Sequence, residues 1–217
     1  MATGAAAGTR GGEYRATARL ARLAANVIGA VVVLAFARAT IRSYEHSHQL
    51  IGAGFIVQQT CVAVAFLVRR PPGSVSRRPS DWVTTLGGSF GGFLLRPGGA
   101  QAAFAAGSIL QISGLTLWML SFFALGRSFG LVAADRGVVT RGPYRVVRHP
   151  LYASYMVTQL GYLMQSASIW NAAVLALTWA CQVARARAEE RLLAGARGPT
   201  YEKYREHVRW RLVPGIW

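Results

Sequence analysis

The chain has 217 residues and a net charge of +16, and it is 53% hydrophobic with only 15% charged residues. Soluble domains usually contain about 25% charged residues, so this composition indicates a protein that is partly in contact with lipid. A charge of this size can accompany nucleic-acid binding, but the basic residues here lie between apolar segments rather than on one polar face. Basic loops beside membrane helices account for the charge, and nucleic acid is not an expected partner.

The apolar stretches are long and do not alternate with polar residues, so they predict helices rather than a barrel. A bilayer core about 30 Å thick needs about 20 apolar residues in a helix. The sequence therefore predicts an all-α polytopic transmembrane helical bundle, in which residues 1–18 form a flexible N-terminal arm and residues 19–125 hold four transmembrane helices. The six predicted apolar segments are residues 20–37, 49–68, 82–95, 100–125, 151–164 and 170–184.

Three of these segments have special features. The third contains Gly87, Gly88, Gly91 and Gly92, which predicts a helix that is tilted, broken, or tightly packed through its small residues. We also expect these glycines to leave room for a lipophilic molecule entering sideways from the membrane. The last two segments are joined by a link so short that they must form a helical hairpin.

The positions of the basic residues predict the orientation. If the N-terminus is cytoplasmic, every lysine and arginine except Arg38, Arg42 and Arg96 falls on the cytoplasmic side. This distribution favours six crossings with both ends inside. An alternative with five crossings, in which the glycine-rich third segment is re-entrant, puts the N-terminus outside. The richness in alanine, glycine and arginine suggests a bacterial chain, and hence the bacterial cytoplasmic (inner) membrane.

The segment 126–152, GRSFGLVAADRGVVTRGPYRVVRHPLY, differs from an ordinary loop. Gly142-Pro143 marks a turn, and Pro150 disfavours a helical conformation at His149, so the next helix begins after it. A cluster of polar and aromatic side chains is therefore expected at the membrane surface. Its members are Tyr144, Arg145, Arg148, His149 and Tyr152.

The segment 185–217 extends the last span into the cytoplasm. Arg185 and Glu189 are four residues apart and share one face of a helix, beside a second carboxylate at Glu190. An exposed ion pair of this kind is worth under about 1 kcal/mol. Here, however, the pair is expected where the helix leaves the bilayer, next to the His149 loop. Residues that follow are expected to form an amphipathic cap over the site: Tyr201, Tyr204, Val208, Arg211 and Pro214.

Together these motifs resemble the isoprenylcysteine carboxyl methyltransferase family of integral membrane methyltransferases. The matching elements are GRSFG at 126–130, VVTRGPYRVVRHPLY at 138–152, the glutamate pair at 189–190, and the YxxY and RLVP elements near the C-terminus. The resemblance covers the region 126–217, which is the expected catalytic region on the cytoplasmic side, and the earlier spans match only in being hydrophobic.

The resemblance implies S-adenosylmethionine as cofactor, bound without a Rossmann fold. Arg185 falls where the family holds the substrate carboxylate, and the neighbouring Arg148 is a second candidate for substrate binding. The candidate catalytic residues are Arg185, His149 and Tyr152. The residues that the resemblance assigns to the cofactor are Arg136, Gly137, Val138, Val139, Tyr144, His149, Pro150, Leu151, Tyr152 and Glu189.

The expected reaction transfers a methyl group to a carboxylate of a lipophilic small molecule or lipid. The surrounding membrane lipids are the other expected partners. A carboxylate is already ionised at neutral pH and needs no general base, whereas a hydroxyl acceptor would need His149 or Tyr152. The scattered cysteines and histidines give no ligand set, so no metal is expected. Two alternatives are an NADPH-dependent membrane reductase of sterol-reductase type and a non-enzymatic transporter or assembly protein.

Overall fold

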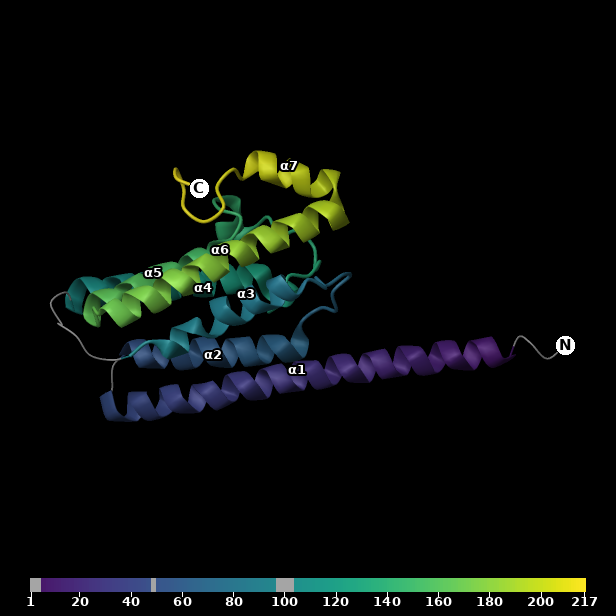
Figure 1. The fold of residues 1–217 in the computed structure, drawn as a ribbon, viewed down its shortest axis with the longest axis horizontal. Coiled ribbons are helices and arrows are strands. Elements are labelled where there is room, and N and C mark those ends of the chain that lie inside the picture. The colour runs from purple at the N-terminus through teal and green to yellow at the C-terminus, as the bar shows by residue number, and fades with distance from the viewer. Residues whose placement is uncertain (1–4, 48–49, 97–103) are drawn as a thin grey trace. The chain divides into compact units, whose positions relative to one another are not determined.

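The computed structural model describes residues 5–47, 50–96 and 104–217, and within these ranges the chain is all-α, as predicted. Two compact units are separated at Val68 and Arg69. In the first, α1 (Ala5–Ser47) and α2 (Leu50–Val68) pack as an antiparallel pair (Figure 1). Gly29 allows this contact because glycine has no side chain. A Cβ at this position would lie 2.5 Å from the Phe66 ring.

Helix α1 begins earlier than the sequence predicts. Residues 5–18 of the expected flexible arm are helical, because an alanine-rich stretch readily extends a helix that already exists. Residues 1–4 lie outside the described residues, as do residue 49 of the second apolar segment and residues 100–103 of the fourth.

The second unit contains the remaining helices. In chain order they are α3 (Pro79–Phe90), η1 (Gly91–Leu94), α4 (Phe104–Leu125), η2 (Gly126–Ser128), η3 (Gly142–Arg145), α5 (Pro150–Gln165), α6 (Ile169–Arg197) and α7 (Pro199–His207). Helix α4 packs against α5, and α3 packs against α6 (Figure 1). The short connection between α5 and α6 agrees with the predicted hairpin, although each helix makes its main contacts elsewhere.

The glycines of the third segment close α3 onto α6. A Cβ on Gly91 would lie 3.2 Å from Cβ of Thr178, and one on Gly88 would lie 3.3 Å from the backbone nitrogen of Gln182. At Gly91 the α-helix changes to the 3₁₀ turn η1, so the segment is both tightly packed and broken. The space that the sequence suggested for a lipophilic substrate is filled at these positions by side chains and backbone of α6.

Small residues also bring α4 and α5 together, as is common between membrane helices. A Cβ on Gly114 would lie 2.6 Å from the backbone nitrogen of Thr158 and 2.9 Å from the carbonyl oxygen of Ser154. We therefore expect Gly114→Val to destabilise the protein by about 1–3 kcal/mol, because the backbone of α5 must shift. Thermal unfolding in detergent measures this change.

Gly195 provides the matched control. It lies within α6, and apart from the backbone of its own helix turn no atom lies within 4 Å of its potential Cβ, so Gly195→Ala should leave stability unchanged or raise it by up to about 1 kcal/mol. Equal unfolding temperatures for Gly114→Val and the unchanged chain would contradict the close contact between α4 and α5.

Three helical segments of the described residues are long and apolar enough to cross a membrane: Arg19–Arg42, Ile51–Val68 and Ala105–Ser128. Helix α5 has 16 residues, which corresponds to about 24 Å at 1.5 Å per residue, less than a bilayer core of about 30 Å. Helix α3 is shorter still. The number of crossings, five or six, therefore stays a prediction.

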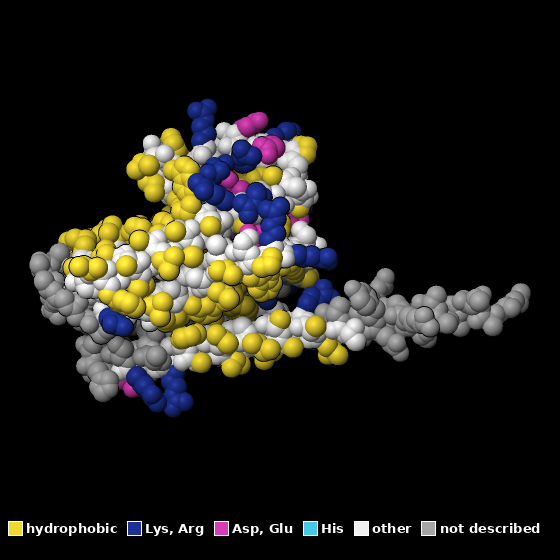
Figure 2. Space-filling model, viewed as in Figure 1, with side chains coloured by type: hydrophobic (Ala, Val, Ile, Leu, Met, Phe, Trp, Pro, Cys, Tyr) yellow, Lys and Arg dark blue, Asp and Glu magenta, His cyan; other side chains and the backbone are white. Residues whose placement is uncertain are grey.

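Charged and apolar side chains occupy different parts of the second unit. Hydrophobic side chains cover the sides of the helices, whereas lysine, arginine, aspartate and glutamate gather around α7 and the C-terminal tail (Figure 2). Helix α6 connects the two regions, since its first half is apolar and its last half is charged. Gly198 then reverses the chain with φ of 45°, a conformation that favours glycine, and α7 begins at Pro199.

Candidate active site

The charged end of α6 supplies one wall of a cavity. Arg185, Glu189 and Leu193 follow one another at intervals of four residues, so they lie along one face, and all three line the cavity. The Nε of Arg185 lies 3.5 Å from Oε1 of Glu189. Arg185 is only 6% exposed and the Glu189 side chain is 23% exposed, so the pair is largely removed from solvent and is not a surface contact.

The loop before α5 supplies the opposite wall. Helix α5 begins at Pro150, and His149 has non-helical backbone angles, as the sequence predicts. The C-terminal tail holds this loop by two backbone hydrogen bonds of 2.8 Å, which Arg148 donates to the carbonyl of Trp210 and His149 donates to that of Arg211. The backbone at His149 is therefore fixed on both sides, by the start of α5 and by the tail.

Glu190 joins the loop, α6 and the tail at one buried carboxylate. Its Oε1 lies 3.2 Å from Nε2 of His149 and 3.1 Å from Nε of Arg148, and its Oε2 accepts a 2.9 Å hydrogen bond from Arg211. Burial alone would raise the pKa of Glu190, but the hydrogen bond and charge of His149, with the charges of Arg148 and Arg211, bring this pKa below its ordinary value. The carboxylate is thus ionised and fully engaged, which suits a structural link.

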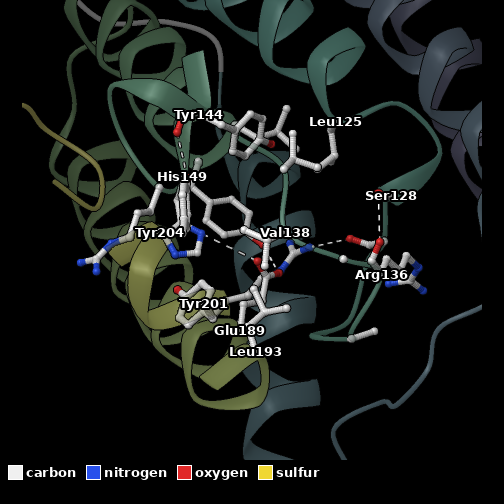
Figure 3. Close-up of a pocket in the computed structure, with 18 of the residues that line it drawn as sticks. Leu125, Ser128, Arg136, Val138, Tyr144, His149, Glu189, Leu193, Tyr201 and Tyr204 are labelled. Carbon is white, nitrogen blue, oxygen red and sulfur yellow. Dashed lines mark hydrogen bonds and ion pairs between the residues drawn. The ribbon is translucent and has the colours of Figure 1, made fainter. Parts of the chain in front are cut away.

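Glu189 faces the cavity instead. Its side chain is 23% exposed and accepts a hydrogen bond from the Tyr152 hydroxyl. His149 Nδ1 lies 3.8 Å from its other oxygen, and the rings of His149 and Tyr152 stack at a centroid distance of 5.6 Å. Figure 3 shows His149, Tyr201 and Tyr204 on one side of the cavity and Arg136 on the other. Glu189 is therefore a carboxylate that three side chains orient and that a bound cation can still reach.

Arg185 ties three elements together at the cavity. Its Nη1 donates a 3.0 Å hydrogen bond to the Ser89 hydroxyl on α3, and its Nη2 donates one of 3.1 Å to the Gly130 carbonyl. The guanidinium also lies 4.8 Å from the centre of the Tyr152 ring. A guanidinium has five N–H donors, so these contacts leave donors for a further carboxylate.

The loop between η2 and η3 presents its backbone to the cavity. Asp135 accepts hydrogen bonds from the Gly137 N–H at 3.1 Å and from Arg197 at 2.8 Å. Burial opposes ionisation of Asp135, but these two hydrogen bonds and the charge of Arg197 leave its pKa below the ordinary value. Burial, together with the charge of Arg69, lowers the pKa of Arg136 to about 10, so Arg136 remains a cation at neutral pH.

Tyrosines from α7 cover the site, as the sequence predicts. Tyr201 is almost fully buried, and the hydroxyl of Tyr204 donates a 2.9 Å hydrogen bond to the carbonyl of Tyr144. Burial raises the pKa of all three phenols, so they are neutral. Leu193 and Val138 pack against this cap, which excludes water from one side of the cavity.

The cavity has a volume of about 110 Å³. The structure brings nearly all of the predicted site residues to its wall: Arg136, Gly137, Val138, Val139, Tyr144, Arg148, His149, Leu151, Tyr152, Arg185 and Glu189. Pro150 is the exception, since it is fully buried at the start of α5 and does not line the cavity. Residues far apart in the sequence, such as Tyr144 and Tyr204 at a separation of 60 positions, therefore meet at one place.

Some lining residues were not predicted. They are Leu125, Ser128, Gly130, Val132, Ala134 and Leu193. The four-residue spacing from Arg185 and Glu189 could have identified Leu193, and Ser128 and Gly130 belong to the GRSFG motif. Leu125, Val132 and Ala134 carry no chemical signal, because an apolar residue next to a cavity has the same sequence character as one in a core.

The fold and the site define a helical protein with membrane-type spans and a buried polar cavity where its charged and apolar parts meet. Residues 100–198 match the model of the phospholipid methyltransferase family, which includes membrane methyltransferases of the isoprenylcysteine type. This match confirms the resemblance found in the sequence and indicates a membrane methyltransferase. A search of curated proteins finds no match to the chain.

Proposed function

We propose that the protein is an S-adenosylmethionine-dependent methyltransferase that methylates the carboxylate of a lipophilic acceptor at the cytoplasmic face of the bacterial inner membrane. The observation that carries the proposal is the shared cavity: His149 and Tyr152, at the start of α5, line the same space as the Arg185–Glu189 pair. The matched family supports the reaction class. The excess of arginine in the segments around the cavity supports the cytoplasmic orientation.

The chemistry of the lining residues fits the methyl donor. Bound S-adenosylmethionine would supply an electrophilic methyl group on a sulfonium centre. Glu189 is suited to hold the ammonium of the donor by charge-assisted hydrogen bonds, and Arg136 is suited to its carboxylate. The buried, neutral rings of Tyr144 and Tyr201 offer apolar faces for an adenine ring. The backbone of residues 137–139 and the side chains of Leu151 and Tyr152 complete this proposed binding surface.

A carboxylate acceptor agrees with the state of the candidate bases. Both ring nitrogens of His149 face carboxylates, Glu190 at 3.2 Å and Glu189 at 3.8 Å, and the Tyr152 hydroxyl donates to Glu189. Neither group is poised to take a proton from an acceptor. A carboxylate needs no base, and Arg185 can hold it near the 3–3.5 Å reacting distance through its remaining donors. Arg148, which also lines the cavity, is the second candidate to bind the acceptor.

Two measurements on the purified full-length protein test the proposal. Calorimetric titration should show binding of S-adenosylmethionine and no binding of NADPH. Binding of NADPH would indicate a reductase. Membranes incubated with the protein and methyl-labelled S-adenosylmethionine should then yield a labelled lipid whose label is released as methanol by mild alkali. Methyl esters release methanol in this way, whereas N-methyl products do not.

Each outcome decides one part of the proposal. Absence of binding by the unmutated protein would contradict a methyltransferase and leave the transporter or assembly role. Binding with an alkali-stable labelled product would retain the methyltransferase and reject the carboxylate acceptor.

A further inference from the structure

A second cavity, larger than the candidate active site, opens between α7 and the loop that precedes α5. Its volume is about 510 Å³, and its lining includes the cationic side chains of Arg145 and Lys203, with His207 and the hydroxyls of Thr140 and Thr200. None of its described lining residues is acidic. Tyr204 lines both cavities, so its ring forms part of the wall between them. We call this second cavity the basic groove.

The periodicity of α7 explains the charge of the basic groove. Thr200, Lys203 and His207 recur at intervals of three and four, so they share one face of the helix. The acidic residues lie on other faces, and Glu202 is paired with Arg205 at 3.1 Å. Among the described residues no ion pair joins Arg145 or Lys203 to a carboxylate. Both side chains are exposed, and their charges are available to an anion.

The chain next to the basic groove has the properties of a membrane-surface segment. Leu212 of the C-terminal tail belongs to a buried cluster with Tyr152 and Ala153 of α5, against which Met156, Val183 and Trp217 also pack. The tail therefore folds back beside residues expected at the level of the bilayer, rather than extending away into water.

Exposed apolar side chains occur on the tail and on the loop that carries Arg145. Ile216 in the tail is 79% exposed, and Val146, next to Arg145, is 56% exposed. The bridge between Val147 and Trp210 brings the tail beside the loop that carries Arg145. Cationic side chains next to exposed apolar ones are typical of a surface that binds anionic lipid, with the charges at the headgroups and the apolar residues among the acyl chains.

We propose that the basic groove binds the phosphate headgroup of an anionic phospholipid of the surrounding bilayer, and that this contact anchors the α7 cap to the membrane surface. Arg145 and Lys203 neutralise the phosphate, and the hydroxyls of Thr140 and Thr200 can donate hydrogen bonds to its oxygens. The exposed apolar side chains on the Arg145 loop and on the tail favour a lipid over a free phosphate ion, since they offer contacts that only acyl chains can use. The proposal is independent of the methyl-transfer reaction.

Lipid titration of the detergent-purified full-length protein, followed by native mass spectrometry, tests this site. Phosphatidylglycerol should bind at least tenfold more tightly than phosphatidylcholine with the same acyl chains. The double variant Arg145→Gln/Lys203→Gln should lose on the order of tenfold in affinity for phosphatidylglycerol and discriminate poorly between the lipids. The charge-conserving variant Arg145→Lys/Lys203→Arg should keep the preference.

The matched control is Arg205→Gln/Arg209→Gln, which removes the same charge from exposed positions outside the groove lining. This variant should retain the preference for phosphatidylglycerol. Equal losses in both double variants, or no preference in the unmutated protein, would overturn the proposal. Inorganic phosphate that displaces the lipid at similar concentration would also overturn it, because the groove would then be a site for a free anion. Unchanged unfolding temperatures confirm that the variants fold.

Discussion

Replacing Glu189 by Gln should lower the rate of methyl transfer, and the affinity for S-adenosylmethionine, by about two orders of magnitude or more. The substitution removes the negative charge that pairs with Arg185 and that is proposed to hold the ammonium of the donor, while the amide oxygen can still accept the Tyr152 hydrogen bond. Removing one charge of a hydrogen-bonded charge pair at a binding site costs about 2–5 kcal/mol of binding free energy, and each 1.4 kcal/mol corresponds to a factor of ten. Calorimetric titration and initial rates with methyl-labelled donor measure the two effects.

Glu202→Gln is the matched control, because Glu202 is exposed on α7 and pairs only at the surface with Arg205. It should change neither donor affinity nor rate by more than about twofold. A Glu189→Gln protein that folds normally and binds the donor as tightly as the unmutated protein would contradict the assigned role. A fall in unfolding temperature with full activity per folded molecule would show that Glu189 is structural.

Local rules predicted the parts of the site that depend on local geometry. The restriction that Pro150 imposes on His149 correctly located the start of α5. The four-residue spacing of Arg185 and Glu189 correctly placed them on one helical face, because α6 continues without interruption past its apolar half. The match at residues 100–198 confirms the family resemblance, which rested on motifs in the same region.

Features that depend on long-range packing could not be read from the sequence. Glycines in the third segment indicated close packing, but no sequence pattern identified Thr178 and Gln182 of α6 as the residues that pack against them. Spacing placed Arg185 beside Glu189, yet the contacts to Ser89 and Gly130 come from segments far away in the chain. The sequence also could not show that Glu189 and Glu190 have different roles. Adjacent residues on a helix point in different directions, and their partners depend on the tertiary packing.

Glu190 has a structural role in this site. Glu190→Gln should therefore destabilise the protein by about 3–5 kcal/mol. The substitution leaves the cations Arg148 and Arg211, and the ring of His149, around a neutral amide. Because these groups join the loop, α6 and the tail, the loss should appear first as a lower unfolding temperature. Donor affinity at temperatures well below unfolding should change less than in Glu189→Gln, since Glu190 does not line the cavity.

The acid side of the stability profile provides an independent check on Glu190. Its pKa is lower in the folded state than the ordinary value of 4.5, so it contributes stability that is fully present above about pH 4.5 and is lost as the pH falls through the lowered pKa. The unmutated protein should therefore lose stability on acidification below that point, and Glu190→Gln should lose less. Asp135, whose pKa is lowered as well, adds a similar loss, so both proteins are best compared in an Asp135→Asn background. Parallel acid profiles of the two in that background would contradict an ionised, engaged Glu190.

A double-mutant cycle with Arg211→Gln then measures how much of the effect comes from the link between α6 and the tail, since a direct ion pair gives a coupling energy and an indirect effect does not.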